Sequence, residues 1–140
     1  MYITLEADYS VRIVDAIARS GERMVAKAIA KQACISQKFA LQILHKLTTE
    51  GILRSIRGPH GGYEIAKPLE VLSVHDVLRA IEGPIVLNRC LLETNTCTRV
   101  PDKNCPYHRV FKELSELVSK KLASISFADV LNAEIINSEK

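Results

Sequence analysis

A glycine-rich turn constrains the fold of this chain more than any other feature of its sequence. The turn, GPHGG at residues 58–62, separates two short extended runs at residues 52–57 and 62–66. Glycine supplies the positive φ and proline the fixed φ that such turns require. The segment therefore predicts a β-hairpin in a chain whose other periodic segments are helical. We expect a mainly α fold with a small β-hairpin wing.

Helical patterns precede the hairpin. Apolar residues recur at steps of three and four in residues 8–20, and a shorter pattern covers residues 24–33. Ser36 is a favourable N-cap for the next helix, and Gly51 closes that helix as its C′ residue. A helix, a short turn, a capped helix and a glycine-rich hairpin follow one another in a winged helix-turn-helix. We expect this DNA-binding domain to cover residues 1–87.

A polar loop and a long helix are expected after this domain. Residues 88–105 are polar and lack periodicity, which predicts a loop. Pro106 occupies a favoured first helical position, and the helix is expected to run to residue 124. Its apolar stripe consists of Val110, Phe111, Leu114, Leu117, Val118, Leu122 and Ile125. Packing against the same helix of a second chain would bury this stripe, so residues 106–140 are expected to form a dimerisation helix and tail. Packing within the monomer is the alternative.

The positive charge is concentrated in the first half of the chain. Residues 1–67 carry ten Lys and Arg against six Asp and Glu, a net charge of +4, whereas residues 68–140 carry nine against ten, a net charge of −1. This asymmetry indicates a polyanion-binding module. No apolar run approaches the roughly 18 residues of a membrane span, and the first ten residues do not resemble a secretory signal. We expect a cytoplasmic protein.

The helix capped by Ser36 and the wing carry the side chains expected to contact double-stranded DNA. A helix fits the major groove, where glutamine can read adenine and lysine can reach guanine or phosphate. Basic residues on a narrow hairpin can approach the phosphate backbone or the minor groove. The expected contacts are Ser36, Gln37, Lys38, Gln42, His45, Lys46, Arg54, Arg57, Pro59 and His60. The alternative is an ordinary solvated face.

Three cysteines, Cys90, Cys97 and Cys105, lie within sixteen residues, and His108 follows them. In a reducing compartment, clustered cysteines more often bind metal or do redox work than form disulfides. Thiolates and an imidazole suit zinc or an iron–sulfur cluster. The spacings are looser than in most structural zinc sites, which favours the larger cluster over zinc, metal-free thiol chemistry or chance. Cys34 stands apart and is expected to be a small buried core residue.

The wing string GILRSIRGPHGGY resembles the wing of the IscR/NsrR-type family of bacterial winged-helix regulators. The opening MYITLEADYSVRIV and the ending SFADVL after a long helix resemble this family too, and the resemblance covers about residues 1–132. One difference is His60, where the family pattern has a glycine. The resemblance implies a homodimeric transcription regulator that presents paired recognition helices to a palindromic operator.

Family members that keep three cysteines at this place bind an iron–sulfur cluster, which the resemblance assigns here to Cys90, Cys97 and Cys105. The nitric-oxide-sensing branch points to Asp8, donated by the partner subunit, as the fourth ligand of a [4Fe–4S] cluster. The cluster-biogenesis branch points to His108 as the ligand that completes a [2Fe–2S] cluster. Both residues are present, so the cluster type and the fourth ligand stay open. We favour Asp8 slightly, because a carboxylate in an otherwise apolar first helix needs a partner.

The function expected is therefore operator binding controlled by a cluster that senses redox state, nitric oxide or iron supply. A winged-helix regulator with structural zinc or a metal-free thiol switch is the alternative. The sequence contains no Cys-x-x-Cys, no nucleotide-binding glycine motif and no Ser/His/Asp arrangement, so we do not expect an enzyme or redox carrier.

Overall fold

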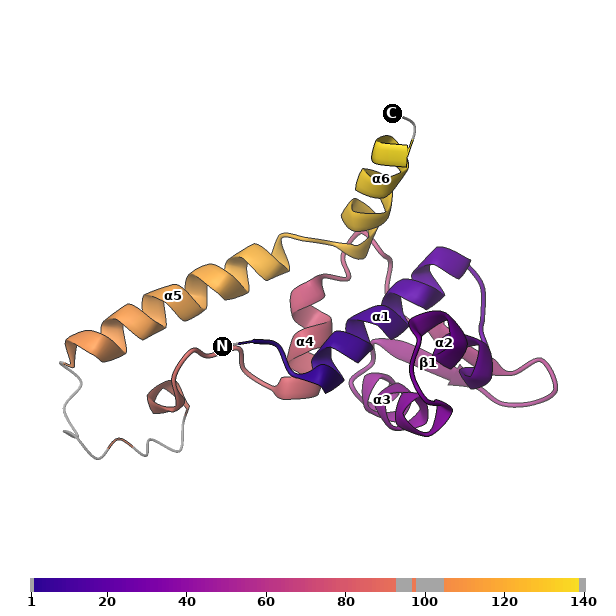
Figure 1. Cartoon of the computed structure of the whole chain (residues 1–140), viewed down its shortest axis with the longest axis horizontal. Helices are drawn as coiled ribbons and strands as arrows, with labels where there is room; N and C mark the ends of the chain where they lie inside the picture. Colours follow the sequence, from indigo (N-terminus) through magenta and orange to yellow (C-terminus); the bar gives the residue numbers. More distant parts are fainter. Residues whose placement is uncertain (1, 93–96, 98–104, 139–140) are drawn as a thin grey trace.

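Helices make up most of the described part of the chain, and a two-stranded hairpin interrupts them, as expected (Figure 1). The structure is a computed structural model that describes residues 2–92, 97 and 105–138, with side chains as far as residue 133. Its elements are α1 (Leu5–Ser20), α2 (Ala26–Ala33), α3 (Gln37–Thr49), β1 (Leu53–Ile56), β2 (Gly62–Ile65), α4 (Val74–Glu82), the 3-10 helix η1 (Arg89–Leu91), α5 (Pro106–Ala123) and α6 (Phe127–Ser138). Among these helices none is both apolar enough and long enough to cross a bilayer.

The first helices of the chain enclose an aliphatic core. Their apolar residues recur at steps of three and four, so each helix turns one face inward. The largest fully buried side chains include Ile13, Val14, Ile29, Ile43, Leu44, Leu47, Leu53, Leu72, Val77 and Phe127. Burial of each such side chain contributes roughly 1.5–3 kcal/mol of transfer free energy. This core holds α3 rigidly while leaving its opposite face in solvent.

Side-chain caps set where the helices begin. The Ser36 hydroxyl accepts a hydrogen bond from the Phe39 N–H at 3.3 Å, which confirms the predicted cap of α3. The Thr4 hydroxyl accepts from the Ala7 N–H in the same way, so α1 begins earlier than the apolar pattern indicated. Gly51 follows α3 with φ +71°, the left-handed conformation expected of a C′ residue.

The wing contains one more backbone pairing than the sequence predicted. Strands β1 and β2 are antiparallel, and Met24 pairs with Tyr63 on the free edge of β2. The two residues exchange N–H···O bonds of 3.0 Å and 2.8 Å. Because Met24 is extended in this bridge, α2 begins at Ala26 and not at residue 24. The link between α1 and α2 thus anchors the wing.

Helix α5 runs out from the helical body toward the end of the molecule opposite the wing (Figure 1). Its C-terminal end is fixed by backbone hydrogen bonds, because Phe127 N–H donates to Leu72 O and Val74 N–H donates to Ile125 O, each at 3.0 Å. The Ser115 hydroxyl on α5 accepts from the Leu87 N–H at 2.9 Å. Helix α5 is therefore attached to α4 at one end and extends past it at the other.

Helix η1 corrects one expectation. Residues 89–91 lie in the segment expected to be loop, but Asn88 caps a short 3-10 turn there by accepting from the Cys90 N–H at 3.4 Å. A three-residue turn is too short to produce apolar periodicity, so the sequence pattern missed it. Most of the remaining predicted loop, residues 93–96 and 98–104, lies outside the described residues.

Candidate nucleic-acid interface and cysteine segment

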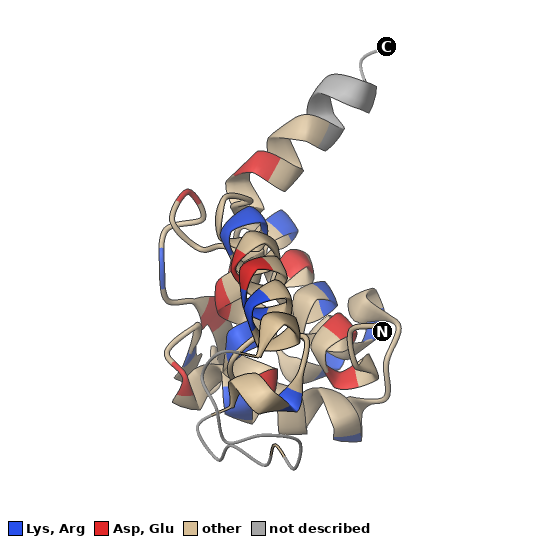
Figure 2. Cartoon of the chain, turned by 90° about the vertical axis from the view of Figure 1, so that its left-hand side faces the viewer, with Lys and Arg blue, Asp and Glu red and all other residues tan. Residues whose placement is uncertain are grey.

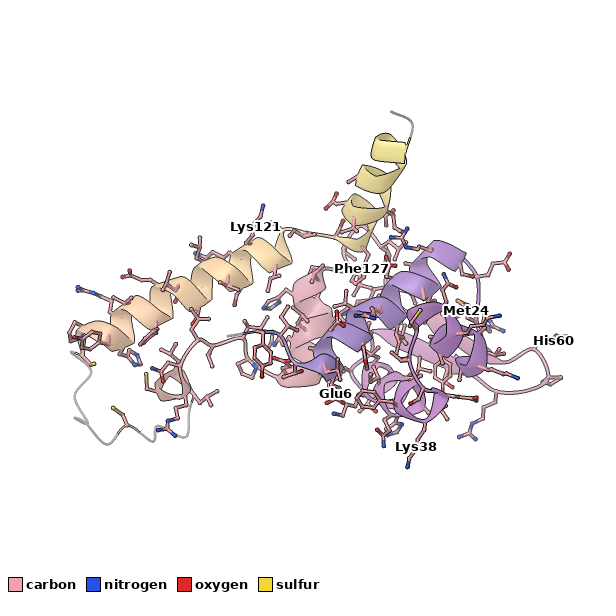
Figure 3. The ribbon with its side chains drawn as sticks, in the orientation of Figure 1. Glu6, Met24, Lys38, His60, Lys121 and Phe127 are labelled. Atoms are coloured by element: carbon pink, nitrogen blue, oxygen red, sulfur yellow. The ribbon has the colours of Figure 1, made fainter. Side chains whose placement is uncertain are left out.

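One face of α3 and the wing present the side chains that the sequence assigned to DNA. All of them, from Ser36 to His60, are exposed. Lys38 points away from the body, and His60 lies at the outer end of the wing (Figure 3). The interface expected from the sequence is therefore accessible, and its two parts are adjacent because α3 contacts β1 of the wing.

Two of the expected contacts are already paired with carboxylates. On α3, Lys46 Nζ lies 2.5 Å from Glu6 Oε1 at the start of α1. On β1, Arg54 Nη2 lies 3.0 Å from Glu64 Oε1 on β2. The sequence pattern could not show these pairs, because each joins residues on different elements. A phosphate group has to compete with these carboxylates for the two cations.

Leu41 is a residue of this face that the sequence analysis missed. It is 43% exposed and lies between Lys38 and Gln42 on the outer side of α3. An exposed leucine there can contact the methyl group of thymine. The available signal was that Leu41 falls outside the spacing of the buried residues Ala40, Ile43, Leu44 and Leu47.

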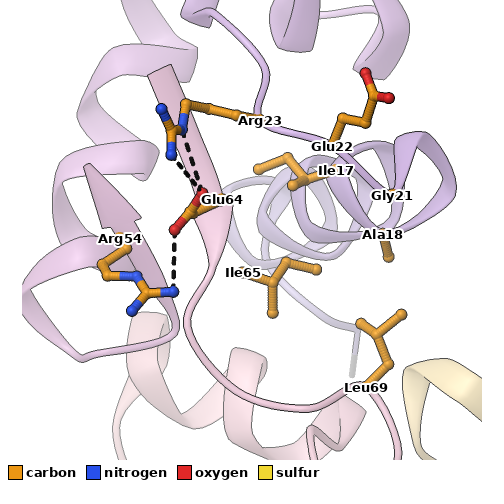
Figure 4. A pocket seen from close by; sticks show the side chains of 9 residues that line it. All are labelled: Ile17, Ala18, Gly21, Glu22, Arg23, Arg54, Glu64, Ile65 and Leu69. Carbon is orange, nitrogen blue, oxygen red and sulfur yellow. Dashed lines mark hydrogen bonds and ion pairs between the residues drawn. The ribbon is translucent and has the colours of Figure 1, made fainter. Parts of the chain in front are cut away.

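A cleft of about 540 Å³ separates the end of α1 from the wing (Figure 4). Its charged lining includes Arg23, Arg54 and Glu64, and the Glu64 carboxylate contacts both guanidinium groups. By contrast, on the side of the molecule where α5 begins, basic and acidic residues are interspersed over the helices (Figure 2). The ion pairs of Glu64 with Arg23 and Arg54 thus form part of the lining of this cleft.

The cysteine ligands predicted from the sequence lie in and beside the segment that joins η1 to α5. Cys90 is half-buried on η1, Cys105 is the half-buried N-cap of α5, and Cys97 is exposed. His108 is half-buried in the first turn of α5, against which η1 packs. Cys90 and Cys105 are free thiols. In the part of the chain that the structure describes, no group of three or more His, Cys, Asp or Glu side chains is arranged to hold a metal ion.

Asp8 is not isolated in α1. Its Oδ2 atom lies 2.7 Å from Arg12 Nη2, one helical turn along. Arg12 in turn lies over the ring of Tyr9, 5.3 Å from the centroid, and Tyr9 packs edge-on against Phe39 of α3 at 5.5 Å between centroids. The reason for favouring Asp8 as a ligand was therefore wrong, because Arg12 already balances its charge. These contacts join Asp8 to the start of α3.

Cys34 is exposed, so the expectation of a buried residue was wrong. It ends α2 in the left-handed conformation, with φ 59° and ψ 46°. The N–H of the next residue, Ile35, donates to Ala30 O at 3.0 Å, and Ile35 packs against the core. This arrangement resembles a Schellman motif, in which the apolar residue after the left-handed position turns inward. Ile35, which is partly buried, therefore makes the core contact that the sequence assigned to Cys34.

The chain is similar to known transcription regulators. A family model described as "Rrf2: Iron-dependent Transcriptional regulator" matches residues 3–133. A predicted HTH-type transcriptional regulator of Haemophilus influenzae is 30% identical over 134 residues, covering 94% of this chain and 87% of that protein. The transcriptional regulator IscR of Yersinia enterocolitica is 28% identical over 138 residues, covering 97% of this chain and 82% of that protein. These relatives are named as transcription regulators and not as enzymes.

Two solved structures share the fold. The structure of T. potens IscR has a TM-score of 0.77 and 21% identity, and the alignment covers 96% of this chain and 88% of that one. The structure of CymR, the global cysteine regulator of B. subtilis, has a TM-score of 0.75 and 23% identity, with coverages of 95% and 98%. Their likeness confirms the predicted winged helix-turn-helix followed by a long C-terminal helix.

Proposed function

This chain belongs to the Rrf2 family of transcriptional regulators, and on that premise we propose that it is a homodimeric operator-binding protein controlled by an iron–sulfur cluster. In this proposal residues 1–87 bind DNA, residues 88–105 carry the cluster ligands and residues 106–140 dimerise. The observation that carries it is the exposed polar face of α3, held rigid by a buried aliphatic face and flanked by a basic wing.

The DNA-binding step follows from the exposed face of α3. The Ser36 cap fixes the start of this helix, so Gln37 and Lys38 in its first turn can reach base edges in the major groove. On the wing, exposed Arg57 and His60 lie where they can contact the phosphate backbone or the minor groove. Base contacts then supply specificity, and the wing supplies affinity that depends on salt.

Dimerisation follows from the apolar stripe of α5. Val110, Leu114, Leu117 and Val118 are all exposed on a helix that extends from the body. Exposed apolar side chains grouped on one helix indicate a protein interface. A second copy of α5 packed on the first by two-fold symmetry would cover the stripe in both chains. Two recognition helices would then face successive major grooves of a palindromic operator.

The donor set fits an iron–sulfur cluster chemically. Three cysteines flank or lie in one segment, and two of them, the free thiols Cys90 and Cys105, lie on η1 and at the start of α5. His108 on the same helix, or Asp8 of the partner subunit, would complete the ligand set. When bound, the cluster supplies a group that responds to oxidants, nitric oxide and iron supply.

The contacts of α1 with α3 provide a route from Asp8 to the DNA interface. Recruitment of Asp8 as a ligand would take its carboxylate from Arg12, and Arg12 lies on Tyr9, which packs against Phe39. A change at Asp8 therefore acts on the first turns of the recognition helix. Coupling of this kind typically amounts to about 1–3 kcal/mol, which changes operator occupancy several- to a hundredfold.

Anaerobic purification of the full chain, followed by an absorption spectrum and iron and sulfide counting, tests the cluster. The wild-type chain and the matched control Cys34→Ala are both expected to be coloured. The iron and sulfide content per chain is expected to be the same in these two proteins. Cys97→Ala is expected to lose both while keeping its helical circular dichroism. A colourless wild-type chain that stays iron-poor after reconstitution would contradict the cluster. Stoichiometric zinc in that chain would support a structural zinc site, and metal-free operator binding that responds to thiol oxidation would support a thiol switch.

A further inference from the structure

An arginine from outside the wing makes three hydrogen bonds to it. Arg23 belongs to the link between α1 and α2 and directly precedes Met24, whose backbone pairs with Tyr63. Its guanidinium group donates from Nε and Nη2 to Glu64 Oε2, at 3.2 Å and 3.1 Å. Its Nη1 donates to the backbone oxygen of His60 at 3.1 Å. Arg23 thus contacts both the second strand and the tip of the wing.

The backbone of the wing is shaped to bring Arg23 this close. A Cβ atom at Gly62 would lie 2.5 Å from Met24 O, a distance that no ordinary side chain tolerates, and a tight 3.2 Å from Arg23 Cγ. Gly62 also has φ +147°, which L residues rarely adopt. Glycine at this position therefore allows the Met24–Tyr63 bridge to form, and the bridge places the Arg23 side chain along β2.

Glu64 serves two arginines at once. Its Oε2 accepts from Arg23, and its Oε1 lies 3.0 Å from Arg54 Nη2 (Figure 4). A carboxylate on a surface that meets DNA phosphates costs binding energy through charge repulsion. Its side chain is only 26% exposed, in contact with cations that fit its planar geometry. Glu64 is best explained as an anchor for the arginines and not as a DNA contact.

We propose that Arg23, anchored on Glu64, is a positioning residue for DNA binding that fixes the wing tip through the His60 carbonyl. The inference rests on the proposed DNA interface. The Arg23 guanidinium is occupied by the wing, so Arg23 acts by holding Arg57 and His60 in place and not by contacting phosphate itself. Without it, the tip remains joined to the domain through the hairpin ends and the Met24–Tyr63 bridge.

The test compares Arg23→Gln, Glu64→Gln and the double variant with Arg19→Gln as a matched control. Arg19 also carries a positive charge paired with a carboxylate, Asp15, at 2.6 Å, but within α1. Two properties are measured: hydrogen exchange of wing amides without DNA, and operator affinity as a function of salt. Exchange of core amides in α1 and α3 reports whether each variant keeps its fold.

Arg23→Gln is expected to speed exchange of the wing amides and to weaken operator binding by about two- to tenfold, with little change in the salt slope. Glu64→Gln removes a negative charge that repels DNA phosphates. It is nevertheless expected to speed hydrogen exchange of the same wing amides, because it removes the anchor of Arg23. The double variant is expected to exchange no faster than the faster single variant, because both remove one clamp. Arg19→Gln is expected to leave wing exchange unchanged.

Three results would overturn the assignment. Unchanged wing exchange with a salt slope reduced by about one would show that Arg23 is a phosphate ligand. Faster wing exchange with undiminished operator affinity would show that the wing position does not matter for binding. Failure of the wild-type chain to bind any DNA would overturn the proposed function and this role together, while the exchange data would still report the clamp.

Discussion

The Lys46 ammonium group on the recognition helix is paired with the Glu6 carboxylate at the start of α1, with 2.5 Å between Nζ and Oε1. Lys46 was expected to contact DNA, and Glu6 lies two residues before Asp8 in the same helical turn. The pair therefore joins a proposed ligand region to the DNA-reading element. When DNA binds, its phosphates have to compete with Glu6 for this cation.

Glu6→Gln is expected to raise affinity for DNA of any sequence by about two- to fivefold at low salt, since an exposed ion pair is worth roughly 0.2–1 kcal/mol. The measurement is a salt titration of binding by fluorescence anisotropy. Glu113→Gln, which makes the same charge change on exposed α5, is the control. Equal effects from both variants would attribute the gain to net charge and not to release of Lys46.

Leu41→Ala is expected to reduce discrimination between operator and non-specific DNA by roughly three- to tenfold, as for loss of one base contact. The reason is that Leu41 presents an exposed apolar side chain on the face of α3 that carries Lys38 and Gln42. The sharper measurement replaces each operator thymine in turn with deoxyuridine, which lacks the methyl group. The wild-type chain should lose affinity at one position where Leu41→Ala does not. If both proteins respond alike at every position, Leu41 does not read a thymine methyl group.

The fold was predictable from local signals, whereas pairing across elements was not. The Ser36 cap, the Gly51 stop and the hairpin glycines each depend on a few neighbouring residues, and the structure confirms each prediction. The Met24 bridge joins residues far apart in sequence, and no periodicity reports it. A hydrophobic pattern predicts which face is buried, but it does not predict which cation meets which carboxylate.

Cys34 shows a different limit. Its small apolar character favours burial, but the left-handed end of α2 turns its side chain outward and places Ile35 against the core. Whether Cys34 is buried or exposed therefore depends on the backbone conformation of this one residue. The cysteine segment has a third limit, because its proposed metal-binding role rests on family resemblance and donor chemistry, and most residues around Cys97 lie outside the described part of the chain.

Leu117→Glu is expected to convert the proposed dimer to a monomer by weakening association roughly a hundredfold or more, because two-fold symmetry places an uncompensated charge in the interface twice. Leu117 is 64% exposed in the single chain, so the substitution should leave the fold intact. Sedimentation equilibrium measures the association constant. Lys120→Glu, another exposed position of α5, is the control. A Leu117→Glu protein that stays dimeric would place the interface elsewhere.

Ser73→Ala is expected to lower the free energy of unfolding by about 1 kcal/mol at neutral pH, because it removes one half of the capping box at the start of α4. Burial alone would raise the pKa of Asp76, but hydrogen bonds from the Ser73 backbone N–H and hydroxyl, together with the nearby positive charges of Lys67 and His75, lower it. The folded-state pKa lies below the unfolded value. This contribution is therefore present above about pH 4 and is lost as the pH falls through the folded-state pKa.

Urea denaturation between pH 7 and pH 2.5 measures the effect. The difference in the free energy of unfolding between the wild-type chain and Ser73→Ala should become smaller in acid, when protonated Asp76 no longer accepts the cap hydrogen bonds. Ser20→Ala, at the exposed end of α1, is the control. A difference that stays constant across this pH range would show that the stabilisation by the cap does not depend on the ionisation of Asp76.

In the proposed function, an iron centre on the cysteine segment controls how tightly paired α3 helices bind an operator. Operator affinity is therefore measured anaerobically, before and after iron is removed with a chelator, at a fixed protein concentration. We expect the affinity to change at least several-fold for the wild-type chain and for Cys34→Ala, and not to change for Cys97→Ala. Equal affinity of the iron-loaded and iron-free wild-type chains would show that the iron centre does not control operator binding.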